Sequence, residues 1–150
     1  MRIAGINKCS LNNGDGVRMV VFVQGCAHHC QGCQNPDTWD FNGGTEMSVE
    51  EISVLYKRRE HVLDGITLSG GDPFYQQEEC SKLLALLPGV NVWIYTGFEY
   101  DEIKDTELAK RADVIVDGLF VEELKCEGKL YGSSNQRIIR KGKEIKVTPK

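Results

Sequence analysis

The stretch "RMVVFVQGCAHHCQGC", residues 18–33, joins an apolar run to a loop with three closely spaced cysteines. The run is rich in β-branched residues and stops at Gly25, which is typical of a short buried strand. The cysteines follow directly, at positions 26, 30 and 33. In α/β proteins the loops at the carboxyl ends of the strands carry the function, so this stretch predicts both a fold and the place of its site.

The alternation of strand and helix patterns continues along the chain. Ser48 and Glu51 have the spacing of a capping box, which predicts a helix from there to about Arg59. A second helical stripe has apolar residues at 80, 83, 84 and 87, and Cys80 within it is expected to be a core thiol. Residues 100–112 have helical composition. Further strands are expected at residues 65–71, 90–97, 113–118 and 136–140.

Repeated alternation of this kind predicts right-handed βαβ units and a parallel sheet. A complete eight-fold barrel takes about 250 residues, more than the 150 of this chain. We therefore expect an α/β fold of parallel βα units in a single domain, residues 1–150. A partial, incomplete TIM-type barrel is the expected form, with a doubly wound sheet as the alternative. The cysteine loop, "GGDP", "TGF" and "DGLF" each follow a strand, and four unusual loops at one edge predict one site.

The charge balance and the absence of targeting patterns limit the function. A formal net charge of −4 argues against nucleic acid as a partner, because a surface that follows phosphates needs an excess of basic residues. No apolar run approaches membrane-spanning length, and the N-terminal residues lack the core of an export signal. Six cysteines in such a chain indicate the reducing cytoplasm, where metal binding or catalysis is commoner than disulfides.

Four interpretations of the cysteine loop follow from its residues. A buried helical stripe fits the spacing, but Gly25, Gly32 and the Asn-Pro pair favour a loop. A disulfide between two of the three cysteines would leave the third unpaired, and a reducing compartment disfavours disulfides. Zinc could take the three cysteines with His28 or His29, although structural zinc usually draws two separated pairs of ligands. A [4Fe–4S] cluster with only three cysteines would keep one iron open to a small molecule.

The spacing C-x₃-C-x₂-C resembles the cluster motif of the radical S-adenosylmethionine superfamily. The longer segment "NNGDGVRMVVFVQGCAHHCQGCQNPDTW" resembles the N-terminal signature of the glycyl-radical-enzyme activases. Its form C-x-H-x-C-x-G-C is most similar to that of the activating proteins of anaerobic ribonucleoside-triphosphate reductase. "SGGDP", "WIYTGF", "VDGLF" and "GSSNQR" follow in the order and spacing of that family. The resemblance therefore covers almost the whole chain.

The resemblance implies a [4Fe–4S] cluster and S-adenosyl-L-methionine as cofactors, with the reactive radical borne by the cofactor and no catalytic side chain. The implied metal ligands are Cys26, Cys30 and Cys33. The implied contacts to S-adenosylmethionine are the backbone of Gly32, Cys33 and Gln34 beside adenine, and Gly70, Gly71 and Asp72 at the methionyl end. Asp72 or nearby carbonyls would accept from the ammonium group. His28 would either tune the cluster through a hydrogen bond or be an exposed loop residue, and Trp39 would fasten the loop to the core.

The implied function is activation of anaerobic (class III) ribonucleoside-triphosphate reductase. Reductive cleavage of S-adenosylmethionine would give a 5′-deoxyadenosyl radical, which would take hydrogen from a glycine Cα of the reductase and leave a glycyl radical. The implied partners are the large reductase subunit and a flavodoxin or ferredoxin-type electron donor. Two alternatives are radical chemistry on another glycyl radical enzyme or a small molecule, and a non-catalytic zinc-binding interaction module.

Overall fold

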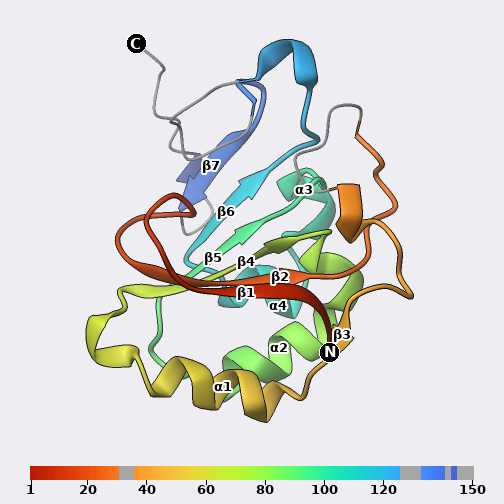
Figure 1. Cartoon of the computed structure of the whole chain (residues 1–150). Helices are drawn as coiled ribbons and strands as arrows, with labels where there is room; N and C mark the ends of the chain where they lie inside the picture. Colours follow the sequence, from red (N-terminus) through yellow and green to blue (C-terminus); the bar gives the residue numbers. More distant parts are fainter. Residues whose placement is uncertain (31–35, 126–132, 141–142, 145–150) are drawn as a thin grey trace.

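The computed structural model describes residues 1–30, 36–125, 133–140 and 143–144, and Figure 1 shows them as one sheet with helices along it. Within these residues the sheet has eight strands in the order β3-β1-β2-β4-β5-β6-β7-β8. The strands are β1 (Arg2–Ser10), β2 (Arg18–Val23), β3 (Thr45–Glu46), β4 (Gly65–Gly70), β5 (Val92–Tyr95), β6 (Val114–Asp117), β7 (Arg137–Arg140) and β8 (Lys143–Glu144). The α-helices are α1 (Val49–Lys57), α2 (Gln77–Ala85), α3 (Tyr100–Ile103) and α4 (Glu107–Arg111). Short 3₁₀ turns are η1 (Pro36–Thr38), η2 (Glu60–Val62), η3 (Pro73–Gln76) and η4 (Glu122–Leu124).

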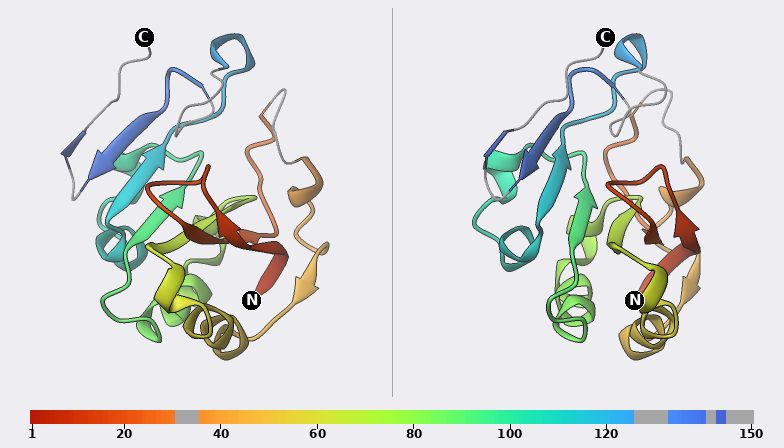
Figure 2. Two further views of the ribbon diagram at one scale, coloured as in Figure 1. Left: turned by 60° about the vertical axis from the view of Figure 1, so that its left-hand side comes forward. Right: turned by 90° about the vertical axis from the view of Figure 1, so that its left-hand side faces the viewer.

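The centre of the sheet consists of four parallel strands, β2, β4, β5 and β6, as the strand–helix alternation predicts. Their order across the sheet follows their order along the chain, so each crossover steps in the same direction. Right-handed crossovers that all step one way place their helices on one face of the sheet. The two views in Figure 2 agree with this one-sided arrangement. None of the helices in the described ranges is long and apolar enough to cross a membrane.

The flanks of the sheet are antiparallel, so the sheet is mixed and is not built of parallel units alone. β1 pairs antiparallel with β2, and β7 pairs antiparallel with β6. Residues 11–17 join β1 to β2, which is too short a connection for a parallel crossover. The sequence pattern did not predict β1, because polar residues such as Asn7 and Lys8 interrupt its apolar alternation. By contrast, β7 lies within the strand expected at residues 136–140.

Alternation along the strands gives the sheet two different faces. On the helix side, Val21 of β2 and Leu68 of β4 belong to a large core with residues of all four α-helices. Cys80 is fully buried in that core, which confirms the expected core thiol. On the opposite face a smaller apolar cluster consists of Trp93, Val114, Val116 and Ile138, with Tyr95 packed against it. This second cluster contains no residue of an α-helix.

Arg18 stabilises the end of the sheet opposite the cysteine loop. Its buried guanidinium donates to Thr67 Oγ1 at 2.8 Å and to three backbone carbonyls and the Asn91 side chain at 2.8 to 2.9 Å. Burial lowers the pKa of Arg18, and these acceptors offset the cost of burying its charge. A Cβ on Gly14 would lie within 3 Å of the Arg18 and Trp93 side chains. Gly14 and Arg18, which stand four residues apart just before and at the start of β2, therefore stabilise the fold.

Candidate functional site

Loops from the carboxyl ends of the four parallel strands meet at one edge of the sheet. The Gly71 amide donates to the carbonyl of Val23 at 2.8 Å, and the Asp72 amide donates to the carbonyl of Gly25 at 3.0 Å. Across the next two loops, the amide of Gly118 donates to the carbonyl of Phe98 at 3.0 Å. The four segments that the sequence singled out therefore form one continuous surface.

The cysteine loop is closed at its base by hydrogen bonds between its two ends. The amide of Gly25 donates to Thr38 O at 2.6 Å, and that of Cys26 donates to Trp39 O at 3.2 Å. The buried Gln24 side chain donates to the carbonyls of Asp37 and Asp40, at 3.0 and 2.8 Å. These contacts hold residues 37–40, where the chain leaves the cysteine loop, against the end of β2.

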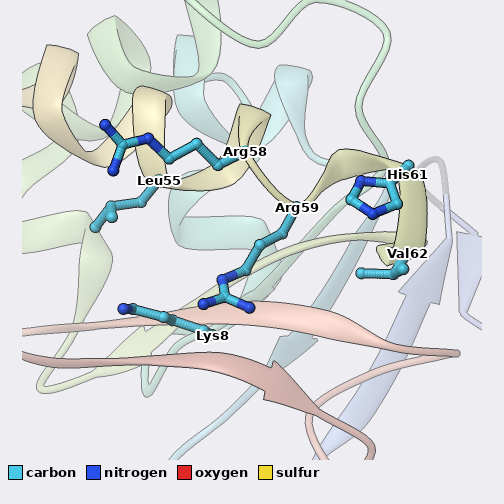
Figure 3. Close-up of a pocket in the computed structure, with 6 residues that line it drawn as sticks. All are labelled: Lys8, Leu55, Arg58, Arg59, His61 and Val62. Atoms are coloured by element: carbon cyan, nitrogen blue, oxygen red, sulfur yellow. The ribbon is translucent and has the colours of Figure 1, made fainter.

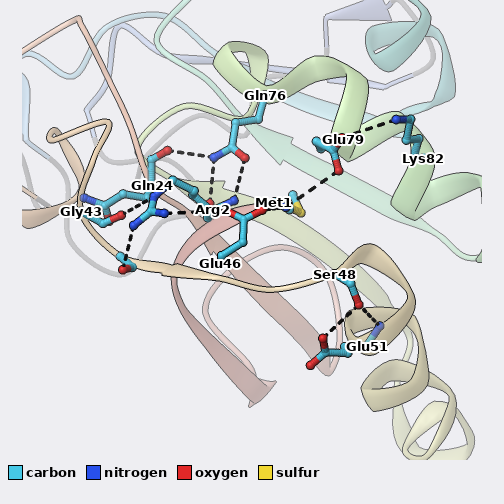
Figure 4. A network of polar contacts seen from close by, with 11 residues as sticks. Met1, Arg2, Gln24, Gly43, Glu46, Ser48, Glu51, Gln76, Glu79 and Lys82 are labelled. Carbon is cyan, nitrogen blue, oxygen red and sulfur yellow. Dashed lines mark hydrogen bonds and ion pairs between the residues drawn. The ribbon is translucent and has the colours of Figure 1, made fainter.

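A second polar network supports this base from the other side (Figure 4). The Gln76 side chain donates to the carbonyls of Arg2 and Gln24, at 2.8 and 2.9 Å, and accepts from the Arg2 amide at 3.0 Å. The Arg2 guanidinium in turn donates to Gly43 O at 2.8 Å. The end of β2 is thereby tied to β1, to η3 and to the segment that follows the loop.

Two of the three expected metal ligands lie in the described part of the loop. Cys26 is buried and Cys30 is partly exposed, whereas Cys33, Gly32 and Gln34 lie outside the described residues. Within the described ranges, no three histidine, cysteine or acidic residues are grouped closely enough to hold a metal ion. The structure therefore tests neither the complete ligand set nor the expected adenine contacts.

The surroundings of Cys26 suit a thiolate that is bound to a metal. Burial raises the pKa of the Cys26 thiol, while the backbone amides of His28 and His29 donate to the sulfur and lower it. A buried thiolate with amide donors still needs a positive charge beside it, which a metal centre supplies. Thiolate ligands with N–H donors are the donor set of protein iron–sulfur clusters, so the described residues fit such a group.

Asp72 connects three of the four loops through its carboxylate. The side chain is fully buried. Its carboxylate accepts hydrogen bonds from Thr96 Oγ1 at 2.9 Å, from Gly97 N at 2.9 Å and from Phe74 N at 3.1 Å. His28 Nε2 lies 2.7 Å from Asp72 Oδ2. These four groups match the roughly four lone-pair positions of a carboxylate. The carboxylate is therefore occupied by the protein itself, which favours nearby carbonyls over Asp72 as acceptors for a ligand ammonium.

His28 is packed into the site. Its side chain is 13% exposed, and its ring centroid lies 4.7 Å from that of Phe98 and 5.6 Å from that of Tyr75. A Cβ on Gly97 would lie 2.6 Å from the imidazole, so glycine is needed there. Of the two sequence hypotheses for His28, exposure is wrong. Its ring nitrogen is paired with Asp72.

The neighbouring His29 has a different role. Its backbone has a φ of 49°, in the left-handed region, and its ring stacks on that of Trp39 with centroids 4.5 Å apart. This stack joins the outgoing and returning halves of the cysteine loop. Trp39 therefore contacts the loop itself, and its Nε1 is buried without a hydrogen-bond partner in the described part of the chain.

The two glycines of "SGGDP" allow the cysteine loop and the β4 loop to pack backbone against backbone. Gly70 has a φ of 99°, and a Cβ there would lie 2.5 Å from the backbone of Val23. A Cβ on Gly71 would collide with the carbonyl of Gly25. Both glycines are thus required by the protein's own packing, in addition to any approach by a ligand.

The face of the sheet that carries no α-helices lies beside these loops, and its central row of Val20, Thr67, Trp93 and Val114 is buried. Pairing of Val20 with Thr67, Thr67 with Trp93 and Trp93 with Val114 places a row of side chains across this face. The next row towards the cysteine loop includes Phe22, Ser69 and Tyr95, each partly exposed. The Tyr95 hydroxyl is buried and has no hydrogen-bond partner within the described residues, and burial raises its pKa. Its electrostatic neighbours are Arg18 and Asp15, at the end of the sheet opposite the cysteine loop.

Sequence reasoning missed several of these residues. Thr96 and Phe98 flank Gly97 in "TGF", which the sequence marked as an unusual loop without assigning roles. Tyr95 ends the preceding strand, where strand alternation places it on the face that carries no α-helices. Gln24 gives no local signal, because its partners are backbone carbonyls brought near only by the folded loop.

A family model described as a 4Fe-4S single cluster domain matches residues 12–139. The fold and site thus define an α/β protein of the single-cluster iron–sulfur class. The anaerobic ribonucleoside-triphosphate reductase-activating protein of Enterobacteria phage T4 is 38% identical over 140 residues, which cover 89% of this chain and 90% of that protein. The protein of the same name from Salmonella typhi is 40% identical over 138 residues, covering 83% and 88%. That from Escherichia coli K12 is 36% identical over 136 residues, covering 83% and 88%.

The chain belongs to the family of anaerobic ribonucleoside-triphosphate reductase-activating proteins. This confirms the resemblance carried by the cysteine loop and the downstream motifs. Among solved structures, QueE from Escherichia coli has a TM-score of 0.54 at 14% identity, covering 77% of this chain and 69% of that one. At that identity the likeness concerns the fold alone.

Proposed function

We propose that this protein activates an anaerobic ribonucleoside-triphosphate reductase by reductive cleavage of S-adenosylmethionine at a [4Fe–4S] cluster. The observation that carries the proposal is the convergence of the cysteine loop with the β4 and β5 loops at one edge of the sheet, in a chain of this family. When bound and reduced, the cluster would supply the electron that splits S-adenosylmethionine into methionine and a 5′-deoxyadenosyl radical. That radical would take a hydrogen atom from a glycine Cα of the reductase.

The chain's own residues would bind the two cofactors. Cys26, Cys30 and Cys33 are the proposed iron ligands. The proposed S-adenosylmethionine contacts are the backbone of Gly32, Cys33 and Gln34 on the adenine side and the Gly70–Gly71–Asp72 segment on the methionyl side. In that last segment, the filled hydrogen-bond positions of the Asp72 carboxylate favour recognition of the ammonium through backbone carbonyls.

The edge of the sheet beside the cysteine loop would receive the protein substrate, next to the partly exposed Phe22 and Tyr95. Phe22 and Tyr95 are large side chains that limit the water beside the loops, and a reactive radical requires such exclusion. The reacting glycine would thus be presented from the face that carries no α-helices.

Several broader features belong to the same proposal. The unidirectional order of β2, β4, β5 and β6 supports a segment of a TIM-type barrel wall. The single sheet supports one domain over residues 1–150. We further propose a flavodoxin or ferredoxin-type electron donor and a cytoplasmic location, where thiolates stay reduced.

The test is anaerobic purification and reconstitution of the protein, with the reductase supplied separately. We expect about four irons per chain, formation of 5′-deoxyadenosine on reduction with S-adenosylmethionine, and a glycyl radical signal in the reductase by electron paramagnetic resonance. Cys26→Ala should abolish iron binding, and the matched Cys80→Ala variant should retain it. A colourless protein with one tightly bound zinc would support the interaction module instead. Formation of 5′-deoxyadenosine without a radical on the reductase would indicate another target.

A further inference from the structure

A groove of about 450 Å³ lies away from the cysteine loop, between β1 and the end of α1 (Figure 3). We call it the basic groove; it is lined by Lys8, Leu55, Arg58, Arg59, His61 and Val62. In Figure 3 Arg59 points from the end of α1 towards Lys8 on β1. Three permanent cations and a histidine therefore surround a partly apolar floor, in a chain whose net charge is −4.

The cations of the basic groove lack counter-ions. Within the described residues, none of Lys8, Arg58 and Arg59 forms an ion pair, and neither does His61. Several other surface cations are paired, as Arg140 is with Asp15 at 2.6 Å. Like charges gathered without an anion repel one another, so the groove is electrostatically suited to a negatively charged partner.

Local helix stability explains only part of this arrangement. Arg58 caps the carboxyl end of α1, where the helix dipole favours a cation. Lys8 comes from a strand distant in sequence, and His61 comes from η2, so the dipole of α1 does not account for their placement. The exposed Val62 and half-buried Leu55 add an apolar surface between the charges. An occupant therefore needs acidic groups together with an apolar side chain.

The shape of the surroundings favours an extended segment. β3 pairs with β1 only at Arg2 and Ile3, so no described strand covers the outer edge of β1 from residue 4 onward. Exposed strand edges commonly accept extended chains from other proteins. An acidic stretch of polypeptide lying along this edge would bring its carboxylates to the basic groove.

The position of the groove indicates which partner supplies that stretch. Lys8 lies between Asn7, which pairs with Val20, and Ser10, which pairs with Arg18. It is therefore beside the first residues of β2, whereas the cysteine loop begins after the last. The strand between them spans roughly 20 Å. A partner that engages both the basic groove and the cysteine loop therefore has to extend along the whole length of β2, as a large protein substrate would.

We propose that the basic groove binds an acidic segment of the reductase and holds the two proteins together while the glycine loop enters the site. This inference rests on the proposed function. The groove would contribute affinity and association rate without taking part in the cleavage of S-adenosylmethionine.

The test compares two triple variants with the same change in net charge. One carries Lys8→Glu, Arg58→Glu and Arg59→Glu; the control carries Lys82→Glu, Lys104→Glu and Lys110→Glu, which are all exposed and lie outside the basic groove. The reconstituted proteins are titrated with the reductase at low and high salt, and 5′-deoxyadenosine formation is measured without reductase. Iron content and melting temperature verify that each variant is folded. If the first variant does not fold, the corresponding Lys8→Gln, Arg58→Gln and Arg59→Gln protein replaces it.

We expect the groove variant to bind the reductase about tenfold more weakly at low salt, with a smaller dependence on salt, and the control to bind within about threefold of the original. The glutamine version should lose about threefold. Formation of 5′-deoxyadenosine should be unchanged in all of them. The proposal would be overturned if the groove variant bound the reductase as tightly as the original protein, or if the control lost as much affinity as the groove variant. It would also be overturned if the groove variant bound only the electron donor more weakly. Failure of the original protein to radicalise the reductase would instead overturn the proposed function.

Discussion

Replacing His28 with leucine should loosen the cysteine loop while leaving the rest of the protein intact. Leucine keeps apolar contact with Tyr75 and Phe98 but removes the donor that lies 2.7 Å from Asp72. A hydrogen bond to a buried charged group contributes about 1.5–3 kcal/mol. Asp72 keeps its other three donors, so the loss should stay near 2 kcal/mol and be confined to opening of the loop.

The size of this effect can be measured through thiol reactivity in the metal-free, reduced protein. Cys26 is buried in the loop, Cys80 is buried in the core and Cys9 is exposed. Because 1.36 kcal/mol corresponds to a factor of ten, a loss of about 2 kcal/mol should speed alkylation of Cys26 roughly 30-fold. Mass spectrometry of timed iodoacetamide reactions would follow each site separately.

Two variants serve as controls for the His28 prediction. His28→Gln can place a side-chain donor close to the position of Nε2 and should restore slow labelling of Cys26 in large part. His29→Asn keeps a residue that tolerates the left-handed backbone and should change Cys26 labelling less than His28→Leu. Equal acceleration at Cys26 and Cys80, or no acceleration at Cys26, would refute a local role for the contact with Asp72.

Three further predictions concern the packing of the site and core. Gly70→Ala should destabilise the protein by about 2–4 kcal/mol in urea unfolding, because it adds a Cβ 2.5 Å from the Val23 backbone at a φ of 99°; an unchanged midpoint would contradict the assigned packing. Cys80→Ala should cost about 1 kcal/mol in the same assay with no loss of iron, and loss of iron would show that Cys80 is a ligand. Burial raises the pKa values of Cys80 and Tyr95, so the folded state holds protons that the unfolded state releases above about pH 8.5–10. Stability of the metal-free protein should therefore be complete below that range and fall as pH rises through it, by up to about 1.4 kcal/mol per pH unit for each group, and Cys80→Ala should reduce the slope.

The parallel centre of the fold could be predicted because its signals are local. The four strands β2, β4, β5 and β6 are apolar runs with a glycine at their last residue or within two residues after it, and Ser48 caps α1 as its spacing with Glu51 predicts. The antiparallel flanks depend on tertiary pairing. β1 in particular contains polar residues and has a short connection to β2. Its extended conformation therefore depends on pairing with β2 and not on its own apolar pattern.

The site was predictable in its location but only partly in its contacts. The cysteine loop and "GGDP" follow strands, and their meeting follows from parallel topology. The role of Asp72 could not be foreseen, because its acceptor positions are filled by Thr96 and the Gly97 amide, 24 and 25 residues downstream, and by His28. Turn propensity explains why aspartate occurs in such a sequence, but only the folded arrangement of three loops shows what its carboxylate binds.

The residues that contact Asp72 are far apart in the sequence, and this affects when the protein could acquire its metal in the cell. His28 pairs with a residue 44 positions later, and that residue is held by Thr96 a further 24 positions along. A chain emerging from the ribosome therefore presents the cysteines well before β4 and β5 exist to fix them. Metal loading in the native geometry has to wait until most of the polypeptide has been made, which makes it a late step in maturation.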